Sequence, residues 1–297
     1  MSFKDQLKKF VEDNPKLVSM KPAGDGIYVL KYKKKVFFDN LWNDYLEECR
    51  GTIVDADFNV VSRPFTKVYN YGIEAKAPVL ANETMVTAYR KVNGFMVALT
   101  WHNDDVLVST TGSTDSKYVD YAKEMMLKHM PWADWQMALA NDDNRGMTFM
   151  FECVHPSDPH IIPEKEGMYI LGYRENEFGS KVGHDPCVLQ DLRIMFNCHK
   201  PESVTATMVQ IKNLAKECKH EGFVFYHDDG RAAKIKSPYY LVKKALARKK
   251  DIMSLNKTLV EEEYFPLVAH LTEIKDQFNE MDEQSRLEYI RSFLESK

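Results

Sequence analysis

The sequence contains only five cysteines among its 297 residues, an odd number without a CxxC pair. A disulfide framework is therefore not expected, since such frameworks use paired cysteines in secreted chains. Cys198, His199 and His220 are the available zinc candidates. No second ligand pair follows them at the spacing that zinc fingers use, so a structural zinc site is not expected either.

Long apolar runs are also absent. The longest uninterrupted segments, such as residues 95–99, are far too short to cross a bilayer. The first residues have no long apolar core and no small-residue cleavage site, so a signal peptide is not expected and the cytoplasm is the predicted compartment. Neither GxGxxG after a strand nor GxxxxGK[ST] occurs, which disfavours Rossmann and P-loop phosphate sites.

The net charge of −4 at pH 7 hides an uneven distribution. Residues 261–297 hold ten acidic and four basic side chains, whereas residues 231–250 hold eight basic side chains and no acidic one. The basic segment could attract phosphate groups. For Lys243 to Lys250 taken alone, a solvated helix surface is the preferred interpretation. We expect the acidic tail to pack on the rest of the chain or to contact a protein, because it would repel a nucleic-acid backbone.

Hydrophobic patterns predict strands that are interrupted by helices. Helices are expected over residues 3–13, 116–129, 132–140 and 205–218, and strands over 27–30, 52–54, 60–61, 85–89, 94–101, 106–109, 148–154, 168–173, 222–226 and 232–235. Because no βαβ rhythm appears, an α+β fold with mainly antiparallel sheets flanked by helices is predicted.

The segment after Pro238 has a helical pattern. One apolar stripe is formed by Leu267, Leu271, Ile274, Phe278 and Met281. We therefore predict two domains, a main domain of residues 1–245 and a small helical C-terminal appendage of residues 246–297.

Residues 91–94, Lys-Val-Asn-Gly, lie between two predicted strands. A lysine at a strand end, followed by a glycine that lets the backbone approach a ligand, is a candidate nucleophile. Taken alone, the pattern is interpreted as a surface hairpin turn.

Further segments place charges in predicted strands. Glu152 lies in a very apolar run, where an ionised carboxylate needs a partner or a ligand. Glu221 begins another strand. Lys234 and Lys236 are two residues apart on a strand, so they share one face and favour an anion between them. Each segment alone also fits an edge strand with exposed charges.

Taken in order, Lys91-x-Asn93-Gly94, Phe151-Glu152, Glu221-Gly222-Phe223-Val224 and Lys234-x-Lys236 resemble motifs I, III, IV and V of the covalent nucleotidyltransferases. That superfamily comprises polynucleotide ligases and mRNA capping enzymes. More narrowly, residues 45–245 resemble the phage-type RNA ligase 1 family. Supporting segments are Glu48-Cys49-Arg50-Gly51, Ser62-Arg63-Pro64-Phe65-Thr66-Lys67, Gly112-Ser113, Ile170-Leu171-Gly172-Tyr173-Arg174-Glu175 and Lys234-Ile235-Lys236-Ser237.

The resemblance implies a nucleotidyltransferase (ATP-grasp-like ligase) fold and an ATP-dependent RNA ligase that works in three steps. The lysine of motif I forms lysyl–AMP with ATP, AMP passes to an RNA 5′-phosphate, and an RNA 3′-hydroxyl then displaces AMP. The implied cofactors are ATP and Mg²⁺, with Mn²⁺ as an alternative. The implied partners are RNA ends, with cleaved tRNA as the expected substrate in RNA repair, in the host cytoplasm if the chain is phage-encoded.

The resemblance also implies roles for single residues. Lys91 is the nucleophile, Glu152 accepts a hydrogen bond from a ribose hydroxyl, and Glu221 orients water on Mg²⁺. Lys234 and Lys236 hold the α-phosphate and the leaving side. They would also disfavour the ammonium form of the nucleophile by like-charge repulsion.

Three further residues complete the implied nucleotide site. Arg50 and Lys67 are nucleotide or phosphate contacts, and Gly94 belongs to the cofactor-binding segment. For Tyr240, a core position is the preferred interpretation.

Two positions depart from the family pattern. Asn93 stands where most of these ligases have Asp, as in the ligase domain of fungal tRNA ligases, and Thr111 stands where a lysine is expected. A catalytically altered nucleic-acid- or adenylate-binding member and a DNA ligase stay open as alternatives, as does a capping enzyme. DNA ligases and capping enzymes usually continue into a strand-rich OB-fold, whereas this tail has a helical pattern.

Overall fold

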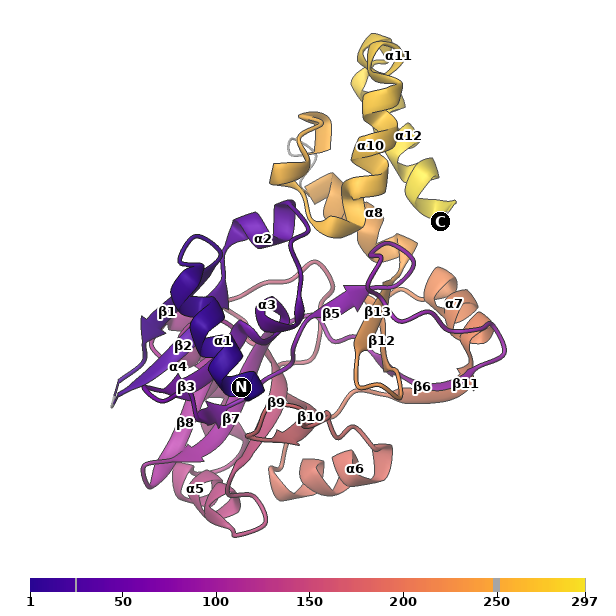
Figure 1. Ribbon diagram of the computed structural model, residues 1–297. Helices are drawn as coiled ribbons and strands as arrows, with labels where there is room; N and C mark the ends of the chain where they lie inside the picture. Colours follow the sequence, from indigo (N-terminus) through magenta and orange to yellow (C-terminus); the bar gives the residue numbers. More distant parts are fainter. Residues whose placement is uncertain (25, 248–251, 297) are drawn as a thin grey trace. The chain divides into compact units, whose positions relative to one another are not determined.

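The computed structural model describes residues 1–24, 26–247 and 252–296 (Figure 1). The chain divides into two compact units. The first unit consists of residues 1–67 and 92–201, and the second of residues 68–91 and 202–297. The predicted α+β class with mainly antiparallel sheets and flanking helices is confirmed. Within the described residues, no helix is both long and apolar enough to span a membrane.

The first unit contains two four-stranded antiparallel sheets. One has the order β1 (Val18–Pro22), β2 (Ile27–Tyr32), β3 (Arg50–Asp55), β4 (Val60–Ser62), and the other β10 (Gly167–Glu175), β9 (Met147–Val154), β7 (Phe95–His102), β8 (Asp105–Thr110). The strands predicted over residues 94–101 and 106–109 are confirmed as β7 and β8, which pair as a hairpin. Asn103 and Asp104 form its turn at φ of 49° and 58°, the left-handed conformation that two-residue hairpin loops use.

Helices of the first unit follow amphipathic patterns. They are α1 (Phe3–Asp13), α2 (Lys34–Phe38), α3 (Asp44–Glu48), α4 (Lys117–His129), α5 (Trp132–Ala140) and α6 (Pro186–Met195). Ser2 caps α1 with a capping box, and Leu7 and Val11 are buried on one side. The helices α4 and α5 pack against β7 and β8. Trp135 of α5 is fully buried and stacks on Phe196.

The second unit is built on one five-stranded sheet. Its order is β11 (Ser203–Thr207), β6 (Met85–Arg90), β12 (Gly222–Tyr226), β13 (Ala232–Lys236), β5 (Val68–Asn70). All neighbours are antiparallel except the parallel pair β13–β5. The helix α7 (Met208–Glu217) packs on this sheet and buries Met208, Ile211 and Ala215.

Helices follow β13 in the second unit. They are α8 (Pro238–Ala247), η1 (Lys257–Leu259), η2 (Glu262–Tyr264), α10 (Phe265–Glu273), α11 (Lys275–Glu280) and α12 (Glu283–Glu295). The predicted apolar stripe spans α10 and α11, where Leu267, Leu271 and Phe278 are buried. A separate domain that begins at residue 246 stays a prediction, since α8 runs through this position.

One predicted helix begins too early. Residues 205–207 belong to strand β11, which pairs with β6, and α7 begins only at Met208. The β-branched Val204 and Thr205 favour the extended strand. Thr207 then starts the helix through a capping box with Gln210. The sequence patterns also missed the short elements β1, β5, α2 and α3, and the helix α6.

Candidate functional site

Each of the two units contains some of the candidate residues. The second unit carries Lys91, Glu221, Lys234 and Lys236, and the first unit carries Arg50, Lys67, Gly94 and Glu152.

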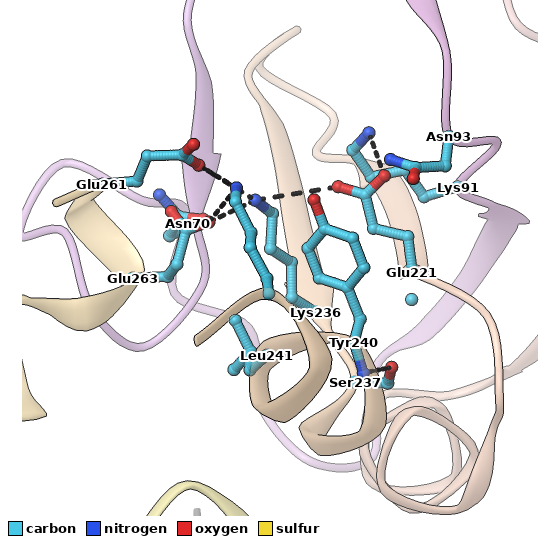
Figure 2. A network of polar contacts seen from close by, with 12 residues as sticks. Asn70, Lys91, Asn93, Glu221, Lys236, Ser237, Tyr240, Leu241, Glu261 and Glu263 are labelled. Atoms are coloured by element: carbon cyan, nitrogen blue, oxygen red, sulfur yellow. Dashed lines mark hydrogen bonds and ion pairs between the residues drawn. The ribbon is translucent and has the colours of Figure 1, made fainter. Parts of the chain in front are cut away.

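In the second unit, Lys91 follows the end of β6 and meets a carboxylate from the neighbouring strand. Its Nζ lies 3.0 Å from Glu221 Oε2 (Figure 2), and the two side chains are 22% and 3% exposed. The backbone N–H of Lys91 donates to the carbonyl of Gly222 at 2.8 Å, which ties β6 to β12. The predicted nucleophile and the predicted metal-binding carboxylate thus form one partly buried ion pair.

Gly222 allows β12 and β13 to come close beside this pair. A Cβ at this position would lie 1.9 Å from the carbonyl oxygen of Ile235, and the φ of +133° favours glycine. Gly222 is also opposite Lys236 in the strand register. The glycine therefore brings Glu221 next to the second lysine of β13.

Lys236 lies between carboxylates on two sides (Figure 2). Its Nζ is 2.5 Å from Glu263 Oε1, 3.7 Å from Glu221 Oε1 and 3.9 Å from Glu261 Oε2. Burial alone would lower the pKa of Lys236, but Glu263 and Glu221 raise it well above its ordinary value. Lys236 is therefore a permanent cation that is neutralised inside its own unit.

Lys234 lies two residues before Lys236 on β13 and also interacts electrostatically with Glu263. It is opposite Asn70 in the parallel pair β13–β5. Burial would raise the pKa of Glu263, but Lys236, Lys244 and Lys234 hold it well below its ordinary value. Both lysines of the predicted pair thus contribute to one electrostatic cluster.

Lys244 corrects the interpretation of the basic segment. A solvated helix surface was predicted here, but Lys244 is buried and forms ion pairs with Glu261 and with Glu263, the latter at 3.3 Å. Lys244 of α8 thus contacts Glu261, which precedes η2, and Glu263, which lies within it. Lys243 is exposed as predicted, whereas Arg248, Lys249 and Lys250 lie outside the described residues.

The sequence patterns missed the glutamates at residues 261–263 as parts of this site. Glu262 accepts a hydrogen bond from Asn70 Nδ2 at 3.2 Å. The hydroxyl of Tyr264 donates to the carbonyl of Leu241 at 2.8 Å, which anchors the segment to α8. A run of three acidic residues was the only available signal, and it was counted as part of a surface tail.

Tyr240 is a core residue, as preferred from its sequence, but it also borders the cluster. Its side chain is buried, and its ring centre lies 5.2 Å from Lys236 Nζ. Burial and Glu221 raise the pKa of the Tyr240 hydroxyl to about 12. The phenol therefore stays neutral beside the ion pairs.

In the first unit, Gly94 and Glu152 are in direct contact. The N–H of Gly94 donates to Glu152 Oε1 at 3.0 Å. A Cβ at residue 94 would lie 2.3 Å from the carbonyl oxygen of Cys153, so the close approach of β7 to β9 requires glycine. Asn93 beside it is buried, and its Oδ1 accepts a hydrogen bond from the N–H of Ile162 at 3.2 Å. The amide of Asn93 therefore has a local structural role.

Lys67 in the first unit contacts aromatic rings. Its Nζ lies 4.2 Å from the ring centre of Trp42 and 5.7 Å from that of Phe37. Arg50 begins β3, and its Nη1 donates a long hydrogen bond of 3.5 Å to the carbonyl of Thr66. Arg50 therefore contacts the residue that precedes Lys67 in the sequence.

The protein offers few ligands of its own to a metal ion. In residues 1–24, 26–247 and 252–296, no group of three or more His, Cys, Asp or Glu side chains is arranged to hold a metal ion. Mg²⁺ is commonly bound by one or two carboxylates together with substrate phosphates and water. The buried carboxylate of Glu221 fits that mode of binding, in which the substrate supplies most of the ligands.

The site thus combines a strand-end lysine with a buried carboxylate on mainly antiparallel sheets, and the family of the chain agrees with the motifs of a nucleotidyltransferase. The chain belongs to the RNA ligase family, whose model it matches over residues 48–240.

The chain is similar to known RNA and DNA ligases. An RNA ligase of Rhodothermus phage RM378 is 25% identical over 290 residues, and the alignment covers 75% of this chain and 65% of the relative's length. A putative ATP-dependent DNA ligase from Aquifex aeolicus has a TM-score of 0.60 at 17% identity, covering 98% of this chain and 76% of that one. An archaeal ATP-dependent RNA ligase has a TM-score of 0.61 at 12% identity, covering 100% and 79%. At these identities the two structures show a shared fold alone.

Proposed function

We propose that this protein is an ATP-dependent RNA ligase that joins a 5′-phosphate to a 3′-hydroxyl through a lysyl–AMP intermediate. The observation that carries the proposal is the ion pair of Lys91 with Glu221 at 3.0 Å in a chain of the RNA ligase family. A lysine at a strand end, held by a neighbouring strand, has the fixed position that a nucleophile requires.

In the proposed first step, Lys91 Nζ attacks the α-phosphorus of ATP. A nitrogen–phosphorus bond forms, the bond to pyrophosphate breaks, and the nitrogen loses a proton. The attacking amine must be uncharged, whereas a carboxylate at 3.0 Å stabilises the ammonium form. The carboxylate of Glu221 therefore has to take another partner, or accept the proton, before Lys91 can react.

The other candidate residues would bind and orient the nucleotide. Lys234 and Lys236 would hold the α-phosphate and the leaving side, and Glu152 would accept a hydrogen bond from a ribose hydroxyl. Glu221 would hold Mg²⁺ or Mn²⁺ together with the substrate phosphates. The metal ion supplies positive charge that neutralises the phosphoryl oxygens.

Arg50 and Lys67 would contact the nucleotide or an RNA phosphate. In the later steps, AMP passes to the RNA 5′-phosphate, and the 3′-hydroxyl then forms the phosphodiester bond while AMP leaves. Repair of cleaved tRNA is the proposed biological setting, in the cytoplasm or in the host cytoplasm if the chain is phage-encoded. These assignments rest on the family resemblance of the residues concerned.

Covalent labelling tests the proposal. The protein is incubated with α-labelled ATP and Mg²⁺ and then denatured. We expect the label to stay on the wild-type protein in an acid-labile bond and to be absent from Lys91→Ala. Lys9→Ala, which changes an exposed lysine of α1, should label normally.

The same assay separates the alternatives. A capping enzyme would take its label from GTP, and a catalytically altered member would bind ATP without a covalent label. Circularisation of 5′-phosphorylated single strands of RNA and of DNA then distinguishes an RNA ligase from a DNA ligase. Absence of any covalent label from ATP would refute the proposed mechanism.

A further inference from the structure

The first unit contains a pair of cations on one face of its N-terminal sheet. Lys31 of β2 is directly opposite Arg50 of β3 in the strand register. Directly opposed residues of antiparallel strands share a face, and like charges in such positions destabilise the sheet. A negative charge near the pair would therefore stabilise this part of the sheet.

A tight turn of the backbone lies against this pair. The N–H of Thr110 donates to the carbonyl of Ser113 at 2.9 Å and closes the turn. A Cβ on Gly112 would lie 2.4 Å from Lys31 Nζ, so the lysine side chain lies directly over this glycine. A side chain at residue 112 would therefore displace the ammonium from this position.

A second glycine brings the turn to Arg50. Gly51 follows Arg50 with a φ of +101°, and a Cβ there would lie 2.9 Å from the Cα of Thr111. A close backbone approach at Gly51 and the lysine side chain over Gly112 thus bring Lys31, Arg50 and the turn of residues 110–113 together.

Neither cation has an acidic partner within the described part of the chain. The guanidinium of Arg50 donates a long hydrogen bond to the carbonyl of Thr66, and among the described residues no hydrogen bond or ion pair engages Lys31 Nζ. Lys31 is half-buried, and its burial, together with nearby Lys21, lowers the pKa of its ammonium. A partly buried cation without a partner is unfavourable, and an oxyanion would remove this penalty.

We propose that Lys31 and Arg50, together with the turn of residues 110–113, form a binding site for a phosphate group. Lys31 is the new member of the site, which deepens the proposed function and rests on it for the identity of the ligand. In an RNA ligase, that phosphate belongs either to ATP or to an RNA strand. Lys31 and Arg50 can donate charge-assisted hydrogen bonds to phosphate oxygens, which are stronger than neutral ones.

The decisive variant is Lys31→Met, which keeps the length of the side chain and removes its charge. Lys21→Met is its matched control, because Lys21 is exposed on the neighbouring strand β1 and carries the same charge. Loss of one charge-assisted hydrogen bond is expected to weaken phosphate binding by about tenfold or more in Lys31→Met. Lys21→Met should change it by less than about twofold.

Two further variants keep the test independent of folding. Lys31→Arg retains the charge and should retain most of the binding. Gly112→Ala keeps every charge but places a Cβ where Lys31 Nζ lies, so it should weaken binding as Lys31→Met does. Removal of an unpartnered, partly buried charge should leave the melting temperature of Lys31→Met at or above that of the wild type.

Binding is measured with three probes: ATP, a 5′-phosphorylated RNA oligonucleotide, and the same RNA with a 5′-hydroxyl. A loss for ATP assigns the site to the nucleotide, and a loss for the phosphorylated RNA alone assigns it to the RNA end. An equal loss for both RNAs assigns it to the strand's internal phosphates. The proposal is overturned if Lys31→Met and Lys21→Met bind all three probes equally.

Covalent labelling of the wild type separates this inference from the proposed ligase activity. If the wild type forms no lysyl–AMP but Lys31→Met still weakens binding, the phosphate site stands and the ligase mechanism fails. If labelling occurs and Lys31→Met matches Lys21→Met for every probe, the ligase mechanism stands and the phosphate site fails.

Discussion

The two units treat their cations differently. In the second unit, Lys91, Lys236 and Lys244 all form ion pairs with glutamates. In the first unit, Lys31 and Arg50 form no ion pair with a carboxylate among the described residues. These three lysines of the second unit are thus neutralised by internal glutamates, as Arg63 of the first unit is by Glu48, whereas the pair Lys31 and Arg50 is left for an external anion.

The difference has consequences for binding and for stability. Glu221, Glu261 and Glu263 balance the three lysines of the second unit, so a phosphate can gain contacts there only after an ion pair is exchanged. Buried ion pairs are costly to break by removal of one partner. The cations of the first unit are ready for an anion, but they contribute less to the stability of the free protein.

The largest effect is expected from Glu221→Gln, which removes the carboxylate that contacts both Lys91 and Lys236. We predict that lysyl–AMP formation slows by about 100-fold or more. The free energy of unfolding should fall by about 3–5 kcal/mol, because buried cations lose their partner. Labelling rates and urea unfolding measure the two effects. Glu217→Gln, an exposed change on α7, serves as the control.

A rate for Glu221→Gln within about tenfold of the wild type, with most of the protein folded, would show that this carboxylate has no part in the first step.

Two neighbouring lysines on α8 allow a buried cation to be compared with an exposed one. Lys244 is buried between Glu261 and Glu263, whereas Lys243 is exposed. We predict that Lys244→Met lowers the free energy of unfolding by about 3 kcal/mol, since two glutamates lose a buried partner. Lys243→Met should lower it by less than about 1 kcal/mol. Urea unfolding of both variants measures the difference, and equal losses would contradict the buried network.

The pH dependence of stability tests the same network. Burial would raise the pKa of Glu263, but Lys236 and Lys244 hold it well below the ordinary value of 4.5. A carboxyl with a lowered folded-state pKa stabilises the protein above its unfolded-state pKa. That contribution is lost as the pH falls through the folded-state pKa. The free energy of unfolding of the wild type should therefore decrease below about pH 4.5.

Glu263→Gln should show a flatter dependence over the same range, because its amide does not titrate. Parallel pH profiles for the two proteins would mean that Glu263 titrates normally.

The smallest effect concerns the aromatic contact of Lys67 in the first unit. A cation above an aromatic ring contributes about 0.5–2 kcal/mol, depending on its exposure. We predict a coupling of about 1 kcal/mol between Lys67→Met and Trp42→Leu in a double-mutant cycle of unfolding free energies. If the losses of unfolding free energy in the two single variants are additive, the Trp42 ring does not stabilise Lys67.

Much of the fold could be predicted from local patterns. The strands predicted over residues 94–101 and 106–109 are found as β7 (Phe95–His102) and β8 (Asp105–Thr110), joined by an Asn-Asp turn, and α5 occupies residues 132–140 as predicted. These elements depend on neighbouring residues alone. The error at residues 205–207 arose because strand pairing with β6 decides the conformation there.

The site was predictable only in part. The pairing of Lys91 with Glu221 follows from motifs that lie at strand ends. The contact between Glu263 and Lys236 depends instead on how the segment after α8 returns to β13. The approach of Lys31 to Gly112 likewise depends on two strands and a turn far apart in the sequence. Such contacts are set by tertiary packing, which composition and periodicity do not record.

The most direct measurement is the mass of the protein after incubation with ATP and Mg²⁺, followed by peptide mapping of the adduct. We predict the addition of one AMP, located on Lys91 and released when 5′-phosphorylated RNA is added. An unmodified protein, or AMP attached to a different side chain, would contradict the assignment of Lys91 as the nucleophile.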